Sequence, residues 1–256
     1  MNKKPNGSQG HFNPKCFASV LANCEGGISR EHYVSSNLLR RLGEAITVSG
    51  FPWQKPGESR IVGIGSLTAK ILCEKHNKEL SKLDDKIGVF FSTLRKYTTE
   101  FNESKSVIQV FNGENIELWA LKVVCGFIAS GNFSIDGEPI PKYVREDWIK
   151  ILFSKKSFPP GLGAYVFAKI NDRYPVAHSL EIAPRCHNVS KNIGGASLIV
   201  GGILNIDLIL MDDIKPSENQ RYHPKFLNFK KNGITQTIGF SWANNGSIES
   251  IDIDMF

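Results

Sequence analysis

Four side chains in the first third of the chain have the types and spacing of a zinc site. Cys73 and His76 stand three residues apart in "CEKHN", and Cys16 and Cys24 lie upstream. Thiolate sulfur and imidazole nitrogen are the donors of closed, tetrahedral zinc sites. The upstream region is rich in turn formers and lacks a hydrophobic core of its own, a common setting for a stabilising metal. We therefore predict a structural zinc held by Cys16, Cys24, Cys73 and His76. The Cys-x7-Cys spacing is longer than usual, and the alternative is that Cys73 and His76 are ordinary side chains at a helix start.

Three further residues beside these ligands could act on a phosphodiester. Glu31 and His32 are adjacent in "SREHYV", and Asn77 follows the last predicted ligand directly. Neighbours on a strand point to opposite faces, so Glu31 and His32 need a local distortion to share one target. Each residue also has an ordinary interpretation, as a solvated acid, an incidental histidine and a helix-capping asparagine. However, the order Cys, Cys, Glu-His, Cys-x2-His-Asn and then a helix is hard to obtain by chance.

The surrounding sequence predicts the elements that would position these groups. "TAKILC" over 68–73 is typical of a short strand. From residue 74 to about 96, apolar residues recur at three- and four-residue steps, which predicts an amphipathic helix. Ser35 or Ser36 can cap a shorter helix upstream. The two metal-ligand pairs would therefore bracket a strand and the start of a long helix.

This ordered set resembles the ββα-metal nucleases, also called the HNH or His-Me finger superfamily, in their zinc-bearing form. The resemblance covers roughly residues 16 to 95, a little under a third of the chain. In that superfamily a zinc knuckle pins a β-hairpin to the helix that follows. The resemblance implies His32 as the general base, and Glu31 and Asn77 as ligands of a catalytic Mg²⁺ or Mn²⁺. One departure is Thr68, which stands where the family often has a second Asn or His on the hairpin.

The residue types suit hydrolysis of a phosphodiester. A neutral imidazole can take a proton from water near neutral pH. A hard cation prefers the oxygens of Glu31 and Asn77, whereas thiolates suit zinc, so two metals at two sites are chemically consistent. Arg40 and Arg41 follow the Glu-His pair closely and could contact phosphates. We predict a metal-dependent endonuclease that acts on DNA, with RNA as the alternative substrate. The alternative functions are a non-catalytic zinc-dependent module that binds nucleic acid and a zinc-stabilised scaffold for protein partners.

Composition and charge are compatible with this interpretation. The 256-residue chain is 41% hydrophobic and 22% charged, with a formal net charge of +6 that would suit a polyanionic partner. Its longest apolar stretch, 196–211, is too short for a membrane span and contains Asp207. The first residues lack the apolar segment of a secretory signal, so we expect a cytoplasmic protein with reduced cysteines. No phosphate-binding loop or GxSxG motif is present, which argues against nucleotide hydrolases and α/β-hydrolases.

The chain as a whole is predicted to be an α+β protein. We expect a flexible leader over 1–15, a zinc-stapled ββα-metal domain over 16–100 and an α+β domain of unassigned role over 101–256, mainly β towards its end. The oligomeric state is not predicted. The scattered His178, His187 and His223 are expected to be structural or exposed, and the segment 221–231 to be a solvated edge with two core phenylalanines rather than a nucleic-acid contact. Helices are expected at 115–130 and 143–154, and strands at 106–111, 163–170, 176–183, 196–211 (as two strands), 235–241 and 247–253.

Overall fold

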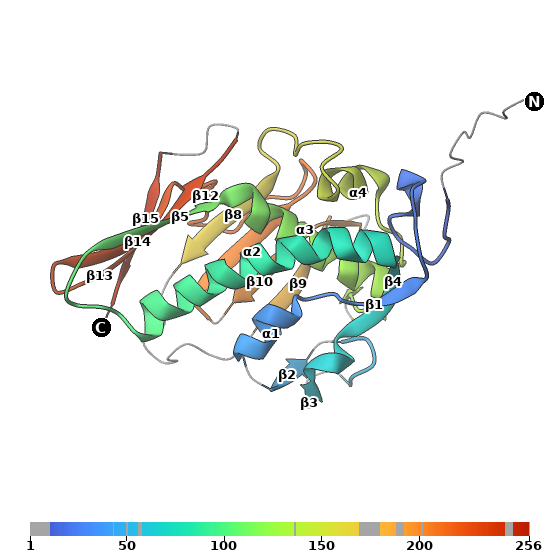
Figure 1. Ribbon diagram of the computed structural model, residues 1–256, viewed down its shortest axis with the longest axis horizontal. Helices are drawn as coiled ribbons and strands as arrows, with labels where there is room; N and C mark the ends of the chain where they lie inside the picture. Colours follow the sequence, from blue (N-terminus) through green and yellow to red (C-terminus); the bar gives the residue numbers. More distant parts are fainter. Residues whose placement is uncertain are drawn as a thin grey trace, which may run out of the picture.

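Two long helices lie side by side through the middle of the molecule, with sheets arranged around them (Figure 1). They are α2 (Glu74–Thr99) and α3 (Gly113–Ser130). The computed structural model describes residues 11–42, 44–49, 51–55, 58–135, 137–168, 180–187, 192–200, 202–243 and 248–255. Most of the predicted leader, His178 and parts of the strands predicted over 163–170 and 176–183 therefore lie outside the described residues.

The helices begin and end where the local sequence favours it. Cys73 is both the last residue of a strand and the N-cap of α2, so the predicted strand-to-helix change at this position is confirmed. The Asn112 side chain accepts a hydrogen bond from the Asn115 backbone N–H at the start of α3, and Gly131 ends that helix in the left-handed conformation. The shorter helices are α1 (Ser36–Leu42) and α4 (Glu146–Leu152).

A short antiparallel pair precedes α2 and makes up the predicted hairpin. It consists of β1 (Ile28–His32) and β4 (Thr68–Cys73). The segment between these strands folds as α1 followed by a second antiparallel pair, β2 (Ala45–Ser49) and β3 (Ser59–Gly63). The sequence showed no period that predicted this second pair.

Two larger sheets follow in the second half. A five-stranded antiparallel sheet has the order β12-β8-β11-β10-β9, and a four-stranded mixed sheet has the order β15-β13-β14-β5. The stretch predicted as two strands over 196–211 forms two neighbours of the first sheet. The strand bounds are β5 (Val107–Asn112), β8 (Gly163–Ala168), β9 (Leu180–Cys186), β10 (Ile193–Val200), β11 (Leu204–Ile209), β12 (Arg221–Tyr222), β13 (Phe226–Lys231), β14 (Ile234–Ser241) and β15 (Ser250–Asp254), with a minor pair β6 (Ser134–Ile135) and β7 (Glu138–Pro139).

The segment 221–231 differs from its sequence-based interpretation. Its second part forms β13, which lies between β14 and β15 in the interior of the four-stranded sheet. Leu227 and Phe229 of this strand are fully buried. The expected edge position was therefore wrong for β13, whereas the expected core phenylalanine is confirmed at Phe229, and Phe226 is half-buried.

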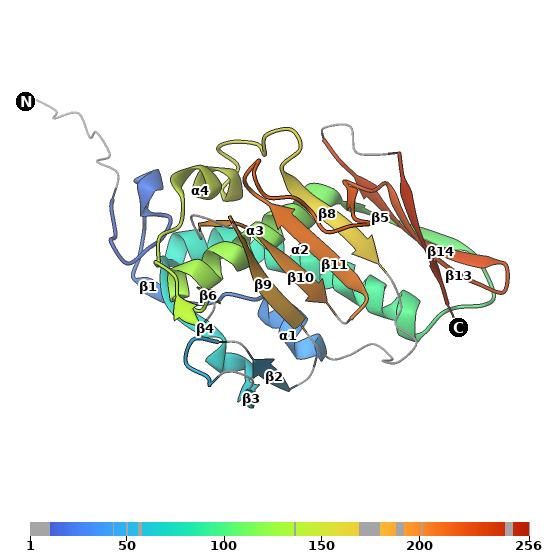
Figure 2. The same cartoon turned by 180° about the vertical axis from the view of Figure 1, so that it is seen from behind.

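Helix α3 is the centre of the hydrophobic core. It packs against α2 on one side and against β8 and β11 of the five-stranded sheet on the other (Figures 1 and 2). Thirteen of its 18 residues are buried, so charged side chains on this helix must find partners inside the protein. One hydrophobic cluster contains side chains from Cys16 to Ile253, and it crosses the boundary expected near residue 100. The division into domains stays a prediction. None of the described helices is long and apolar enough to cross a membrane.

Candidate functional site

The four predicted zinc ligands come from two parts of the chain that β4 brings together. Cys73 ends β4 and His76 lies in the first turn of α2. Cys16 and Cys24 flank a short 3₁₀ turn (Ser19–Leu21). A backbone hydrogen bond of 2.9 Å from Phe17 N–H to the Ile71 carbonyl fixes this loop to β4. All four ligand side chains are buried, so each would be costly to leave without a partner.

The ligand atoms have the spacing that a tetrahedral metal site requires. They all lie within 4.8 Å of one another. His76 Nδ1 lies 3.3 Å from the sulfur of Cys16, 3.9 Å from that of Cys24 and 3.2 Å from that of Cys73. With Zn–S bonds of about 2.3 Å and a Zn–N bond of about 2.0 Å, tetrahedral geometry places sulfur and nitrogen about 3.5 Å apart. The predicted convergence is therefore confirmed, and the cluster can hold a metal ion such as zinc.

Asn23 supports this cluster from outside, and sequence reasoning missed it. Its Oδ1 lies 2.8 Å from His76 Nε2, so the ring donates from Nε2 and turns Nδ1 towards the sulfurs. Burial lowers the pKa of His76, which favours the neutral ring that a metal needs. Burial also raises the pKa of the Cys16 thiol to about 12, so metal binding must release its proton. The position of Asn23 next to Cys24 was the available signal.

His32 ends β1 and is half-buried. Burial lowers the pKa of its imidazole, and the positive charges of Lys122 and Arg40 lower it further. Among the described residues, neither ring nitrogen of His32 has a hydrogen-bond partner. The lowered pKa favours the neutral imidazole, which is the form that a general base requires.

Glu31 lies in a buried charge cluster. Lys122 of α3 places its Nζ 2.6 Å from Glu31 Oε1 and 2.5 Å from Asp84 Oδ2 of α2. Ser35 donates to the other oxygen of Asp84, and the indole N–H of Trp119 donates to the Ser35 hydroxyl at 2.8 Å. Burial raises the pKa of the Glu31 carboxyl, and the Lys122 ammonium opposes that shift. The cation beside Glu31 is therefore an ammonium group of the protein itself.

Asn77 faces β1 and joins the start of α2 to that strand. Its amide Nδ2 donates to Ser29 Oγ at 2.8 Å and to the Arg30 carbonyl at 3.3 Å. Ser29 in turn donates to the Leu72 carbonyl of β4 at 3.2 Å. No hydrogen bond connects Asn77 with Glu31 among the described residues. The pair expected to hold one cation is thus divided between two separate hydrogen-bond networks.

A β-bulge lies at this point of the hairpin. Ser29 is paired with Leu72 and Glu31 with Ala69, so β4 contributes one residue more than β1 between these pairs. A bulge bends a strand and re-aims the side chains beside it. However, Glu31 and His32 themselves pair in regular register with Ala69 and Thr68, so the bulge precedes this pair and does not separate its two residues.

Arg40 and Arg41 extend from the last turn of α1 and are exposed. In the part of the chain that the structure describes, neither guanidinium group forms an ion pair or a hydrogen bond. Arg40 is close enough to His32 to affect its pKa. Arg40 is thus available to an anion near His32.

Lys122 and Asp84 are the residues of this site that sequence reasoning missed. The signal was a single lysine in the otherwise apolar helical segment "LWALKVVCGFIA". A lysine that a helix buries on all sides needs an acidic partner. Comparisons of the chain with protein-family models, with curated proteins and with solved structures found no match.

Proposed function

We propose that the N-terminal unit binds a structural zinc through Cys16, Cys24, Cys73 and His76 and hydrolyses phosphodiester bonds of nucleic acid. The observation that carries this proposal is the placement of His32. Its imidazole, which has no hydrogen-bond partner among the described residues and whose pKa is lowered by burial, ends a strand of the β1–β4–α2 unit, close to Arg40 and beside a Cys₃His cluster that can hold a metal ion. A scaffold for protein partners would not need an imidazole without a hydrogen-bond partner, or a guanidinium group beside it.

In the proposed reaction His32 accepts a proton from a water molecule. The water oxygen forms a bond to phosphorus as the bond from phosphorus to the leaving sugar oxygen breaks. The leaving sugar oxygen then takes a proton from solvent or from the His32 imidazolium. Arg40 and Arg41 bind the phosphate oxygens, whose charge increases in the transition state. The buried Glu31–Lys122 pair positions the end of β1.

The catalytic Mg²⁺ or Mn²⁺ implied by the family resemblance does not fit Glu31 as placed. The Glu31 carboxylate is already neutralised by the Lys122 ammonium at 2.6 Å, and a second cation at the same oxygens would meet like-charge repulsion. Asn77 offers one amide oxygen, which has no donor among the described residues. One neutral oxygen is a weak site for a hard dication, so we assign no reaction step to a metal held by this pair.

The ion pair between Glu31 and Lys122 favours a second candidate function, a zinc-dependent module that binds nucleic acid without cleaving it. The Glu31–Lys122 pair would then be a structural connection between the hairpin and α3. Arg40 and Arg41 would still contact phosphates, because binding needs no general base. The two candidates make the same zinc and binding predictions and differ only in cleavage.

A cleavage assay separates them. Purified protein is incubated with plasmid DNA, single-stranded DNA and RNA, with added Mg²⁺, with added Mn²⁺ and with neither. The general-base role predicts that His32→Ala loses about 10²- to 10⁴-fold in rate and keeps its metal content and melting temperature. His11→Ala serves as the matched control, since it removes an exposed imidazole and keeps the His11 backbone carbonyl that accepts a hydrogen bond from the Cys24 N–H.

The assay can also overturn the proposal. Equal cleavage rates for the wild type and His32→Ala would remove His32 from the mechanism. Binding of nucleic acid without cleavage under any of the three conditions would leave the binding module as the function.

A further inference from the structure

The four-stranded sheet lies at one end of the molecule, and its two edge strands differ in character (Figures 1 and 2). The first edge strand, β15, lies against β8 of the five-stranded sheet and carries the acidic residues Asp252 and Asp254. Charged side chains commonly protect an edge strand from pairing with another chain. The second edge strand is β5, and no strand pairs with its outer side in the part of the chain that the structure describes. The sheet can therefore be extended at β5.

Strand β5 lacks the features that protect an edge strand. The sequence from Ser106 to Gly113 contains no charged residue and no proline. Its pairing with β14 runs in regular register from Val107 to Asn112, so no bulge twists the strand away from a partner. Ile108 and Val110 are 61% and 63% exposed. An exposed, regular and apolar edge strand of this kind is a site for pairing with another strand.

The sequence of β5 is symmetric about Gln109, which indicates what kind of strand fits beside it. Two apolar residues, Val107 and Ile108, precede Gln109, and two apolar residues, Val110 and Phe111, follow it. If two copies of this strand pair antiparallel about a two-fold axis at Gln109, each Val107 lies opposite a Phe111 and each Ile108 opposite a Val110. Every apolar side chain of the strand then has an apolar side chain directly across from it on the same face.

The contacts of β5 within the chain show which face each side chain occupies. Phe111 packs against Phe90 of α2 with ring centroids 5.4 Å apart, and Gln109 Oε1 accepts a hydrogen bond of 3.1 Å from Thr93 Oγ1, also on α2. Gln109 and Phe111 therefore face α2. Because side chains alternate along a strand, Ile108 and Val110 point to the opposite, outer face. On that face the two copies would together bury four exposed apolar side chains.

We propose that β5 pairs with β5 of a second copy of this chain, antiparallel and with the two-fold axis at Gln109. The two four-stranded sheets then form one continuous sheet of eight strands. An axis shifted by one residue would place Ile108 opposite Asn112, or Val107 opposite Gln109, so the symmetric register is the one that matches apolar residues. A two-fold contact of this kind is self-complementary, and it closes at two chains.

Size-exclusion chromatography with light scattering, on the full chain over a range of concentrations, tests for the dimer. We expect the mass of two chains at high concentration. Ile108→Lys places an ammonium group opposite Val110 twice in each dimer, and it should raise the dissociation constant of the dimer about tenfold or more. The matched control is Ile61→Lys, because Ile61 is 76% exposed on β3 and takes no part in this sheet. Both positions are exposed, so both variants should keep the wild-type fold.

A disulfide at the axis tests the register. In the proposed pair the Cα atoms of the two Gln109 residues lie about 4.5 or 5.5 Å apart, which is within the range of a disulfide. Gln109→Cys should therefore form a cross-linked dimer under mild oxidation, and a reducing agent should reverse it, with the wild type as the background. Lys105→Cys is the matched control. Two copies of residue 105 would lie about 26 Å apart along extended strands, too far for a disulfide.

The two experiments together decide the proposal. A dimer that Ile108→Lys weakens and Ile61→Lys does not, with cross-linking at position 109 and not at 105, supports it. The proposal is overturned if the chain is a monomer at every concentration, if both lysine variants weaken the dimer equally, or if positions 105 and 109 cross-link equally well. A dimer without a cross-link at position 109 overturns it as well, because the contact then uses another surface or register. His32→Ala should dimerise like the wild type, so the failure of the proposed nuclease activity would not be mistaken for the failure of this contact.

Discussion

Replacing Lys122 with methionine tests whether the buried charge cluster, rather than a metal ion, neutralises Glu31. Lys122 is 2% exposed at its side chain and bridges Glu31 and Asp84 at 2.6 and 2.5 Å. Met keeps most of the apolar stem of Lys122 and removes the charge. The variant leaves a buried carboxylate without its counter-charge, which typically costs about 3 to 5 kcal/mol. For a domain of this size, that loss corresponds to a fall in melting temperature of roughly 10 °C.

The loss of stability should depend on pH in a defined direction. Burial already raises the pKa of Glu31, and removing Lys122 removes the attraction that opposes this shift. A carboxyl whose pKa is higher in the folded state than in the unfolded state stabilises the fold below the unfolded pKa, and loses that contribution as the pH rises through the folded value. The difference in stability between wild type and Lys122→Met should therefore be small near pH 4 and grow towards pH 8.

Chemical denaturation at several pH values measures this difference. Lys150→Met is the matched control, because Lys150 forms an exposed pair with Glu146 and should lose at most about 0.5 kcal/mol. Adding Glu31→Gln to Lys122→Met should recover part of the loss, because the more deeply buried of the two uncompensated carboxylates is then absent and only Asp84 remains. The reasoning is refuted if Lys122→Met has wild-type stability at pH 7. It is also refuted if Mn²⁺ raises the wild-type melting temperature in a way that Glu31→Gln abolishes.

Three further predictions concern the metal centre, Gly163, and the exposed pair Arg40 and Arg41. Purified protein should contain about one zinc per chain by elemental analysis; Cys73→Ala should lose it and much of the folded signal, whereas the equally buried Cys125→Ala should keep it. Gly163→Ala should lower the melting temperature, because its φ of +119° and the adjacent Glu117 carboxylate leave no room for a methyl group; a wild-type melting temperature would contradict the role of this glycine. Arg40→Ala/Arg41→Ala should weaken binding to DNA and reduce the salt dependence of log Kd by up to about two in slope, and an unchanged slope would exclude both from phosphate contact.

The metal cluster could be predicted from sequence because its chemistry is strongly local. Cys73 and His76 lie one helical turn apart, so the start of α2 by itself directs both to one point. The turn-rich segment around Cys16 and Cys24 has no hydrophobic core of its own, so a shared metal ion was the simplest way to explain how it is stabilised. The convergence of the four ligand atoms within 4.8 Å follows from the pairing of the predicted strand 68–73 with β1.

The long helices could also be predicted from the sequence, because the 3.6-residue period of apolar side chains depends on each helix alone. The pair β2–β3 was missed, since each strand has only five residues and the prolines and glycines of the connecting loop dominate this part of the sequence. The interior position of β13 was missed for a different reason. Whether a strand lies at an edge or between neighbours depends on β14 and β15 rather than on its own residues.

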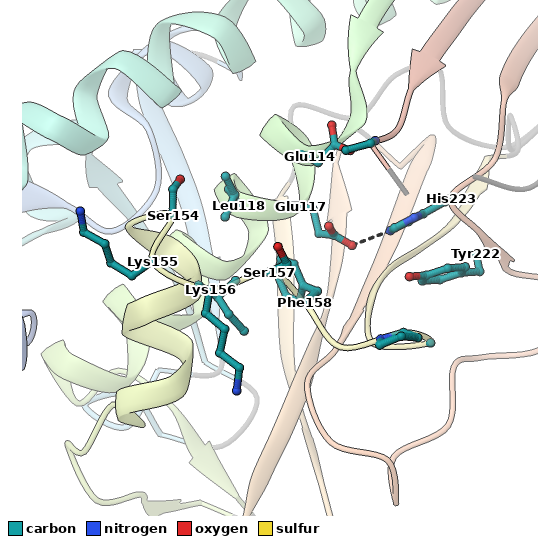
Figure 3. Close-up of a pocket in the computed structure, with 14 residues that line it drawn as sticks. Glu114, Glu117, Leu118, Ser154, Lys155, Lys156, Ser157, Phe158, Tyr222 and His223 are labelled. Atoms are coloured by element: carbon teal, nitrogen blue, oxygen red, sulfur yellow. Dashed lines mark hydrogen bonds and ion pairs between the residues drawn. The ribbon is translucent and has the colours of Figure 1, made fainter. Parts of the chain in front are cut away.

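The partners of the buried charges were decided only by the tertiary structure. Sequence could indicate that Lys122, in an apolar helix, needed an acid, but the Glu31 that pairs with it lies on β1, in the other predicted half of the chain. Glu117 and His223 are separated by 106 positions and meet only because α3 packs against the five-stranded sheet (Figure 3). A buried charge requires a counter-charge wherever it lies, and this requirement can be read from its neighbours in sequence. Which group supplies the counter-charge depends on long-range packing, and here that packing gave Glu31 an ammonium partner where the family resemblance implied a metal ion.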